Sequence, residues 1–381
     1  MRRSIFEGVH EQFRQSVALF VERELRRHHD EIIANHGIKR EAWLAAGEHG
    51  LLGLGVHDHY GGSATGDYRF NAVLHEELAK LGIGFASCFA IHFDVVAPYL
   101  IELTTEEQRE RWLPGFCTGE IVTALAMTEP SGGSDLAALR TTARRAGGDF
   151  ILDGSKTFIT NGGSADLVIV AARTDPTQLS KGITLFAVEA GTPGFVRGRV
   201  LDKVGQPESD TAELFFDSLR LPAENVLGEV NRGFAHMMER LPQERLGAAI
   251  SNVANARAIL DETLLYVKER HAFGQPIGSF QHNKFLLAEL DTKLDVTQAH
   301  LDQAIAAHVA HELSAIDAAK AKWWSSDVQN EVLDACVQLY GGYGYMRESR
   351  VARAWMDARV TKIWAGSNEI MKELIGRDLG L

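Results

Sequence analysis

Cysteine is scarce in this chain of 381 residues, which contains only Cys88, Cys117 and Cys336. Their odd number and wide spacing argue against a disulfide framework and favour a reducing compartment. No two of them are spaced like the ligands of a zinc site. We therefore predict a protein without structural disulfides and without a metal centre.

Basic charge and long apolar runs are also lacking. The net charge of −12 excludes a general nucleic-acid binder, although a local group of arginines could still hold a small polyanion. No run reaches the roughly 18 apolar residues of a membrane span, so we predict none. The first twenty residues contain Arg2 and Arg3 but no apolar core, and Glu7 comes early. This pattern does not fit a signal peptide, and we predict a cytoplasmic protein.

Several common catalytic and nucleotide motifs are absent. The sequence has no Gly-x-Gly-x-x-Gly after a strand, no Walker A motif, no His-Glu-x-x-His and no Gly-x-Ser-x-Gly. A dinucleotide could therefore bind only without a Rossmann unit. Histidines are frequent but scattered, and the pairs at 28–29 and at 57 and 59 are more typical of solvated side chains than of metal ligands.

The first region, residues 1–119, has the pattern of helices. Apolar residues recur there at helical spacing, as at Phe13 and Phe20, and residues 104–108 resemble a capped helix start. The segment 82–97 is rich in small residues. It suits either a pocket wall or tight helix packing.

The middle region, residues 120–229, has short apolar runs typical of strands. Asp153-Gly154 separates two of these runs and predicts a hairpin with a type I′ turn. No helix of crossover length lies between the runs, which favours an antiparallel barrel or sandwich over a parallel sheet. From 230 to 381 long helical patterns return, as at 287–305 and 318–339, and they predict an up-and-down bundle.

The stretch 241–246, Leu-Pro-Gln-Glu-Arg-Leu, stands out in the third region. Pro242 is expected to start or kink a helix because it lacks a backbone N–H. Small residues at 247–250 leave room for a flat ligand or another backbone. Glu244 and Arg245 therefore suit a functional site, and the alternative is a surface ion pair that contributes little energy.

Three glycine-containing loops are candidates for ligand contact. Residues 127–135 offer backbone N–H groups and two hydroxyls, which suits a phosphate or polar heterocycle, or else an ordinary capped turn. Residues 158–163 place an aromatic ring and a hydroxyl on one face, or else simply end a strand. Residues 338–345 interleave glycines with tyrosines, which suits a helix C-cap or close approach to a ligand or a neighbouring subunit.

Together these stretches resemble the acyl-CoA dehydrogenases, most closely the long-chain type, over nearly the whole chain. The motifs are individually of moderate specificity, but they occur in order and at the family's spacing. They are Ala-Met-Thr-Glu-Pro at 126–130, Gly162-Gly163, Thr-Ala-Glu-Leu-Phe-Phe at 211–216, the stretch 241–246, Arg270-x-x-Phe273-Gly274, and Ala-Gly-Ser-Asn-Glu-Ile-Met-Lys-Glu-Leu at 365–374. The resemblance implies an α+β chain with an N-terminal α-helical domain at 1–119, a middle antiparallel β-barrel domain at 120–229 and a C-terminal four-helix bundle at 230–381.

The resemblance also implies FAD, held by residues from two subunits. The contacts implied within one subunit are Leu125, Met127, Thr128, Gly133, Ser134, Phe158, Ile159, Thr160, Ser367, Asn368 and Glu369. Those implied from the neighbouring subunit are Arg270, Phe273, Gln281, Gln338, Leu339, Tyr340, Gly341 and Gly342. The active oligomer is then at least a homodimer, and a homotetramer is common in the family.

The resemblance further assigns a catalytic base. Many members carry a glutamate where this chain has Ala365, whereas long-chain and isovaleryl-type members place it where Glu244 stands. Glu244 would remove the α-proton of an acyl-CoA thioester while the β-hydrogen leaves as hydride to the flavin, giving trans-2-enoyl-CoA. Glu369 is the nearest rival acid. Implied substrate contacts are Ser134, Leu241, Arg245, Ala365 and Gly366.

The favoured interpretation is a dehydrogenase of fatty-acid or branched-acyl degradation that passes electrons to an electron-transferring flavoprotein. Phe158 stands where many relatives have tryptophan, which leaves the acceptor open. The alternatives are an oxygen-using oxidase or monooxygenase of the same fold and a non-catalytic acyl-CoA-binding protein. The presence of Glu244 and of the FAD-loop residues favours the dehydrogenase, and the acyl chain length stays open.

Overall fold

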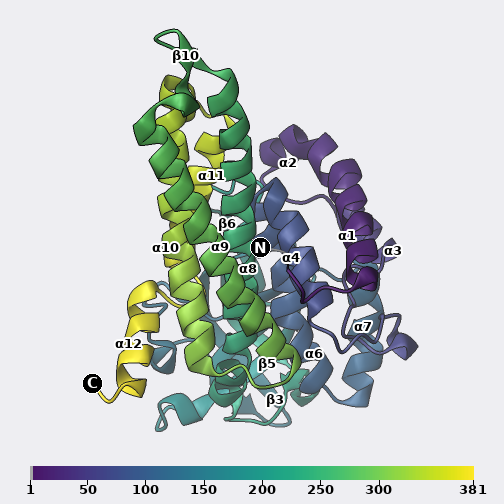
Figure 1. The fold of residues 1–381 in the computed structure, drawn as a ribbon. Coiled ribbons are helices and arrows are strands. Elements are labelled where there is room, and N and C mark those ends of the chain that lie inside the picture. The colour runs from purple at the N-terminus through teal and green to yellow at the C-terminus, as the bar shows by residue number, and fades with distance from the viewer. Residues whose placement is uncertain (1–2) are drawn as a thin grey trace.

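The computed structural model describes residues 3–381, so Arg2 lies outside the described residues. Helices come first, then strands, then helices again, as the sequence predicts (Figure 1). The helices of the first region are α1 (Gly8–Phe20), α2 (His29–Asn35), α3 (Arg40–Glu48), α4 (Arg69–Leu81), α5 (Ile83–Ala90), α6 (Ala97–Glu102) and α7 (Glu106–Thr118). The π-helical segments η1 (Val21–Leu25) and η4 (Ile91–Val96) continue α1 and α5.

Local sequence determines where α7 begins. The Thr105 hydroxyl accepts a hydrogen bond from the Gln108 N–H, and the Gln108 side chain accepts one from the Thr105 N–H. This reciprocal pair is a capping box, which satisfies two N–H groups that the first turn leaves free. The helix ends at Gly119, whose φ of +79° favours glycine.

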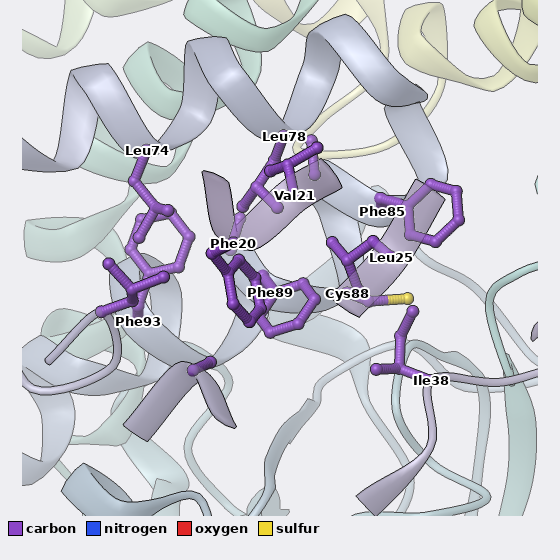
Figure 2. Packing of buried hydrophobic residues seen from close by; sticks show 14 of the residues in the cluster. Phe20, Val21, Leu25, Ile38, Leu74, Leu78, Phe85, Cys88, Phe89 and Phe93 are labelled. Atoms are coloured by element: carbon purple, nitrogen blue, oxygen red, sulfur yellow. The ribbon is translucent and has the colours of Figure 1, made fainter. Parts of the chain in front are cut away.

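An aromatic and aliphatic core joins α1, η1, α4, α5 and η4 (Figure 2). Phe20 meets Phe89 edge-on at a centroid distance of 5.9 Å, with Leu78 and Phe85 in the same cluster. Each buried side chain of this size stabilises the fold by about 1.5–3 kcal/mol. The core thereby holds α5 and η4 in place beside α4.

One helical stretch, Ile83–Glu102, is long and apolar enough by composition to cross a membrane. This match rests on average composition over a window, because His92 and Asp94 interrupt the apolar run. However, 83% of its apolar window is buried inside the protein, against neighbouring helices. The stretch is accordingly a core helix, which passes the same composition test as a membrane span.

The middle region forms an open mixed sheet, so the predicted antiparallel barrel was wrong. The strands are β1 (Thr123–Ala126), β2 (Thr142–Ala146), β3 (Asp149–Ile159), β4 (Leu167–Arg173), β5 (Ile183–Glu189), β6 (Phe195–Val200), β7 (Ala212–Leu221) and β8 (Val226–Leu227). They follow the order β6-β7-β3-β2-β4-β5-β8, with β1 also paired to β4, and β6 and β8 do not close the sheet. β4 runs parallel to β1 and β2. The long connection that a parallel pair requires is supplied by the loop and hairpin between β1 and β4 instead of a helix.

The predicted turn at Asp153-Gly154 was also wrong, because both residues lie inside the continuous strand β3. The β2–β3 turn falls at Gly147-Gly148 instead, where Gly147 has a φ of +67°. Gly154 has a φ of +151°, and the register against β7 shifts beside it. A Cβ at this position would lie 2.6 Å from Thr141 Oγ1, so this glycine permits a bulge rather than a turn.

Three long helices carry the third region: α8 (Gly233–Glu269), α9 (Gln281–Val309) and α10 (Ala315–Tyr340). The shorter α11 (Arg350–Ala358) packs against α10 and α8, so the bundle has three long helices and one short one, and α12 (Asn368–Asp378) lies against α10 (Figure 1). Two short strands, β9 (His271–Ala272) and β10 (Gln275–Pro276), form the tip between α8 and α9. Pro242 lies inside α8, not at its start.

Candidate active site

A cavity of about 260 Å³ lies where the three regions of the chain meet. Its walls come from α4, α5 and η4, from the ends of β1 and β3 and the segments that follow them, from α8, and from the segment before α12. Ala86, Ser87 and Ala90 line it, whereas Gly84 packs tightly against Glu208, so the segment 82–97 serves both as a pocket wall and in packing. Of the predicted site residues, those that line the cavity are Leu125, Met127, Thr128, Gly133, Phe158, Ile159, Thr160, Leu241, Glu244, Ala365 and Gly366.

Glu244 is the carboxyl group that α8 presents to the cavity. Leu241, Glu244, Ala248 and Ser251 follow helical spacing along one face of α8, and all four line the cavity. Removal from water raises the pKa of Glu244 to about 7, against the opposing charge of Arg245. The Tyr99 hydroxyl donates a hydrogen bond of 3.4 Å to Glu244 Oε1, which also opposes the rise in this pKa. A carboxylate with such a pKa can accept a proton near neutral pH.

Arg245 does not form the surface ion pair that was the alternative interpretation. It is only 6% exposed, and no ion pair within 4 Å joins it to a carboxylate of residues 3–381. Burial lowers the pKa of Arg245, and the charge of Glu244 opposes that shift. A Cβ at Gly366 would lie 3.8 Å from its guanidinium, so Arg245 is adjacent to the segment before α12 but does not line the cavity.

The rival acid, Glu369, lies outside the cavity on the first turn of α12. Its own backbone N–H and the Ser367 hydroxyl lower its pKa, which makes it a weaker base. Ser367 caps α12 by accepting a hydrogen bond from the Ile370 N–H. The geometry therefore favours Glu244 over Glu369.

The segment that carries Ala365 and Gly366 is anchored by a buried ammonium. Both residues have positive φ angles, +51° and +89°. Lys322, fully buried on α10, donates to the Gly366 carbonyl at 2.7 Å and to Asn368 Oδ1 at 3.0 Å. Burial lowers the pKa of Lys322 to about 8. Asn368 is thus held by the protein itself, and like Ser367 and Glu369 it does not reach the cavity.

A buried ion pair supports the loop after β1. Lys156 on β3 donates to the Met127 carbonyl at 3.0 Å and to Glu129 Oε1 at 2.9 Å. Glu129 also accepts a hydrogen bond from the Thr141 N–H at 2.9 Å. Its pKa falls to about 2, because Lys156 and the N–H groups of Arg140 and Thr141 outweigh the effect of burial. The loop that brings Met127 to the cavity is therefore fixed from inside.

The end of β3 presents an aromatic ring to solvent and cavity. Phe158 is 68% exposed and has a φ of +59°, which is rare for a bulky residue. Neighbouring Asn161 donates to the carbonyls of Cys88 and Thr123, which fixes the strand end. Strain of this kind is concentrated at functional sites. Ser134, the remaining predicted contact in this region, does not line the cavity.

The residues predicted to contact a neighbouring subunit's cofactor lie elsewhere. Arg270 and the segment 339–342 line a separate hollow of about 510 Å³. Arg270 follows the end of α8, roughly 39 Å along the helix from Glu244. Phe273 in the tip is 95% exposed (Figure 1 labels the adjoining β10). Gln281 begins α9 and Gln338 lies in the last turn of α10, both at this end of the bundle.

Three family models match consecutive parts of the chain: "Acyl-CoA dehydrogenase, N-terminal domain" at 8–120, "Acyl-CoA dehydrogenase, middle domain" at 124–219 and "Acyl-CoA dehydrogenase, C-terminal domain" at 231–380. The chain belongs to the acyl-CoA dehydrogenase family. Its members are oxidoreductases that convert acyl-CoA thioesters to enoyl-CoA.

Individual relatives agree with this assignment. The long-chain specific acyl-CoA dehydrogenase of Mus musculus mitochondria is 45% identical over 99% of this chain and 88% of its own length. The isovaleryl-CoA dehydrogenase of Solanum tuberosum mitochondria is 35% identical over 98% and 91%. The crystal structure of an acyl-CoA dehydrogenase from Geobacillus kaustophilus covers 100% of both chains, with 42% identity and a TM-score of 0.98.

Several residues of this acyl-CoA dehydrogenase site were not predicted. His75, Asp94, Ser251 and Trp364 line the cavity, and Lys322 anchors its edge. Of these residues, only Asp94 could have been suspected from the sequence, because it is the only acid in the apolar stretch 83–97. Buried charges in such a stretch require partners, which is a reason to suspect a site.

Proposed function

We propose that this acyl-CoA dehydrogenase oxidises a long or branched acyl-CoA with FAD, using Glu244 as the base. The observation that carries the proposal is a carboxyl of raised pKa in one cavity with the predicted flavin-loop residues. The α-proton of a thioester is only weakly acidic, so a desolvated carboxylate is a better base than a solvated one. The long-chain and isovaleryl-type relatives support the substrate class.

The residues that face the cavity fit FAD. A planar ring system with polar edges could lie against the backbone around Met127 and the Thr128 and Thr160 side chains, with Phe158 at the exposed side. Bound FAD would accept the β-hydrogen as hydride. Ala365 lines the cavity, and a backbone N–H in its segment would hydrogen-bond the thioester oxygen. One such donor contributes about 3–4 kcal/mol to stabilising an enolate-like charge.

The second group of predicted cofactor contacts supports an oligomer. Arg270, Phe273 and the segment 338–342 lie at the far end of the bundle from Glu244, so within one chain they are remote from its cavity. A second copy of the chain would bring them to the FAD of the first. We propose at least a homodimer, and a homotetramer as in relatives, with an electron-transferring flavoprotein as the electron acceptor in the cytoplasm.

The test is an anaerobic titration of the FAD-loaded protein with acyl-CoAs of graded length and branching, following the absorbance of oxidised flavin. We expect long or branched chains to bleach this band, and electron-transferring flavoprotein to restore it much faster than air. Rapid reoxidation by air would favour an oxidase or monooxygenase instead. FAD-loaded protein that no acyl-CoA bleaches would contradict the dehydrogenase proposal.

A further inference from the structure

A second buried carboxylate lies at the cavity, on η4. Asp94 is 1% exposed, and four side chains surround its two oxygens. Tyr68 and His75 meet Oδ2 at 3.2 and 2.9 Å, while Asn71 and Gln243 donate to Oδ1 at 3.1 and 3.0 Å. An ionised carboxylate can only accept hydrogen bonds, so four donors satisfy it fully.

The same network attaches the turn of α8 that bears the base. Gln243 precedes Glu244, and its amide also donates to the Asp94 backbone carbonyl at 2.9 Å. Its Oε1 lies 3.2 Å from His308 Nε2 on α9. Gly247, one turn further along α8, permits this close approach, because a Cβ there would lie 2.5 Å from Asp94 Oδ2. The base-bearing turn is thus connected to η4 and to α9.

We propose that Asp94 is a positioning residue for the dehydrogenation: it holds the base-bearing turn of α8 through Gln243 and places a fixed negative charge beside Glu244. The inference rests on the proposed role of Glu244 as the base. A negative charge disfavours ionisation of a nearby carboxyl group, which strengthens it as a base. The charge of Asp94 raises the pKa of Glu244, in addition to the larger effect of burial.

Other groups also act on Glu244, and they shift its pKa in the direction opposite to Asp94. Tyr99 on α6 and the guanidinium groups of Arg240 and Arg245 on α8 lower the pKa of Glu244. The charge of Asp94 on η4 acts in the opposite direction and raises the pKa of Glu244. The groups that face Asp94 in turn are Tyr68 and His75 from the side of α4 and His308 from α9.

Asp94→Asn tests the role of the charge in the FAD-loaded full-length protein. The amide keeps the side-chain shape but removes the charge, so the pKa of Glu244 should fall. The rate of flavin reduction should rise with pH as Glu244 ionises and then reach a plateau. In Asp94→Asn we expect the midpoint of this rise, the acid limb, to move to lower pH. The plateau rate should fall about tenfold, because a weaker base removes the α-proton more slowly. A midpoint that stays at the wild-type pH would overturn the electrostatic role.

Gln243→Ala tests the attachment separately, because it leaves the charge of Asp94 in place. We expect the plateau rate to fall about tenfold through misplacement of Glu244, with the midpoint of the acid limb unmoved. Asn71→Ala is the matched control, because Asn71 donates to the same Oδ1 from α4 and makes no side-chain hydrogen bond to α8 among residues 3–381. We expect its plateau rate to fall less than twofold. Equal effects of the two variants would overturn the positioning role.

The outcome also separates this inference from the proposed function. If flavin reduction by acyl-CoA does not depend on Glu244, the proposed function fails. If it does depend on Glu244 and Asp94→Asn leaves the midpoint unchanged, only the inference about Asp94 fails. Should Asp94→Asn not fold, Gln243→Ala and Asn71→Ala still decide the positioning role.

Discussion

Glu244→Gln is expected to lower the rate of flavin reduction by acyl-CoA about 10³–10⁴-fold while the protein keeps its fold and its FAD. Glutamine has nearly the same shape as glutamate, so the cavity and the contact with Tyr99 are retained. It cannot accept the α-proton, and a positioned general base contributes about 10²–10⁴-fold to rate. The measurement is rapid anaerobic mixing of FAD-loaded protein with a long-chain acyl-CoA.

Glu369→Gln is the comparison variant, because Glu369 is the other acid that the sequence offers as a base, but it lies outside the cavity. We expect it to stay within tenfold of the wild-type rate. Flavin bleaching by Glu244→Gln at close to the wild-type rate would refute the assignment of the base. Loss of bleaching in Glu369→Gln alone would transfer the role to that residue.

Lys156→Met is expected to destabilise the protein by about 3–5 kcal/mol. The change leaves Glu129 buried and charged without its ammonium partner, and breaking such a pair from one side costs about this much. Because Lys156 also holds the Met127 carbonyl, the loop beside the proposed flavin site should loosen and FAD should be retained less well. Urea unfolding, with flavin content measured in parallel, checks both expectations.

Arg377→Met provides the control for this experiment. Arg377 pairs with Glu373 one turn earlier in α12, where both side chains are exposed, and such pairs contribute about 0–1 kcal/mol. Lys156→Met combined with Glu129→Leu should recover much of the lost stability, since no uncompensated charge is then buried. A loss below about 1 kcal/mol in Lys156→Met would show that the buried pair does not support the loop.

Features encoded in short stretches of sequence were predictable. The capping box that starts α7 needs only Thr105 and Gln108, and the succession of helical and strand patterns follows from local periodicity. The small residues at 82–97 were assigned to a pocket wall or to packing, and both hold, since Ala86 and Ala90 line the cavity while Gly84 packs against Glu208. The position of Glu244 between Pro242 and small residues suggested a functional site but left a surface ion pair open, and only the family resemblance assigned it the role of base.

Features that depend on distant partners were not predictable. β1 pairs with β4 across the β2–β3 hairpin, and this parallel pairing makes the sheet mixed. At Gly154 a turn signal was overridden by pairing with β7 and by the close approach of Thr141. Gln243 meets Asp94 across 149 positions of sequence, and Lys322 meets Gly366 across 44. No local pattern specifies such contacts.

The pH dependence of flavin reduction tests the central claim, that Glu244, half-buried at the cavity, is the base, most directly. Below its pKa the carboxyl is protonated and cannot accept the α-proton, so the single-turnover rate should fall as the pH falls through about 7 and level off above it. The measurement is rapid anaerobic mixing with a long-chain acyl-CoA across this range, in protein shown to keep its FAD throughout. A midpoint near 7 that disappears in Glu244→Gln is the predicted result. A rate that stays flat down to the ordinary range of a solvated carboxyl would contradict the account.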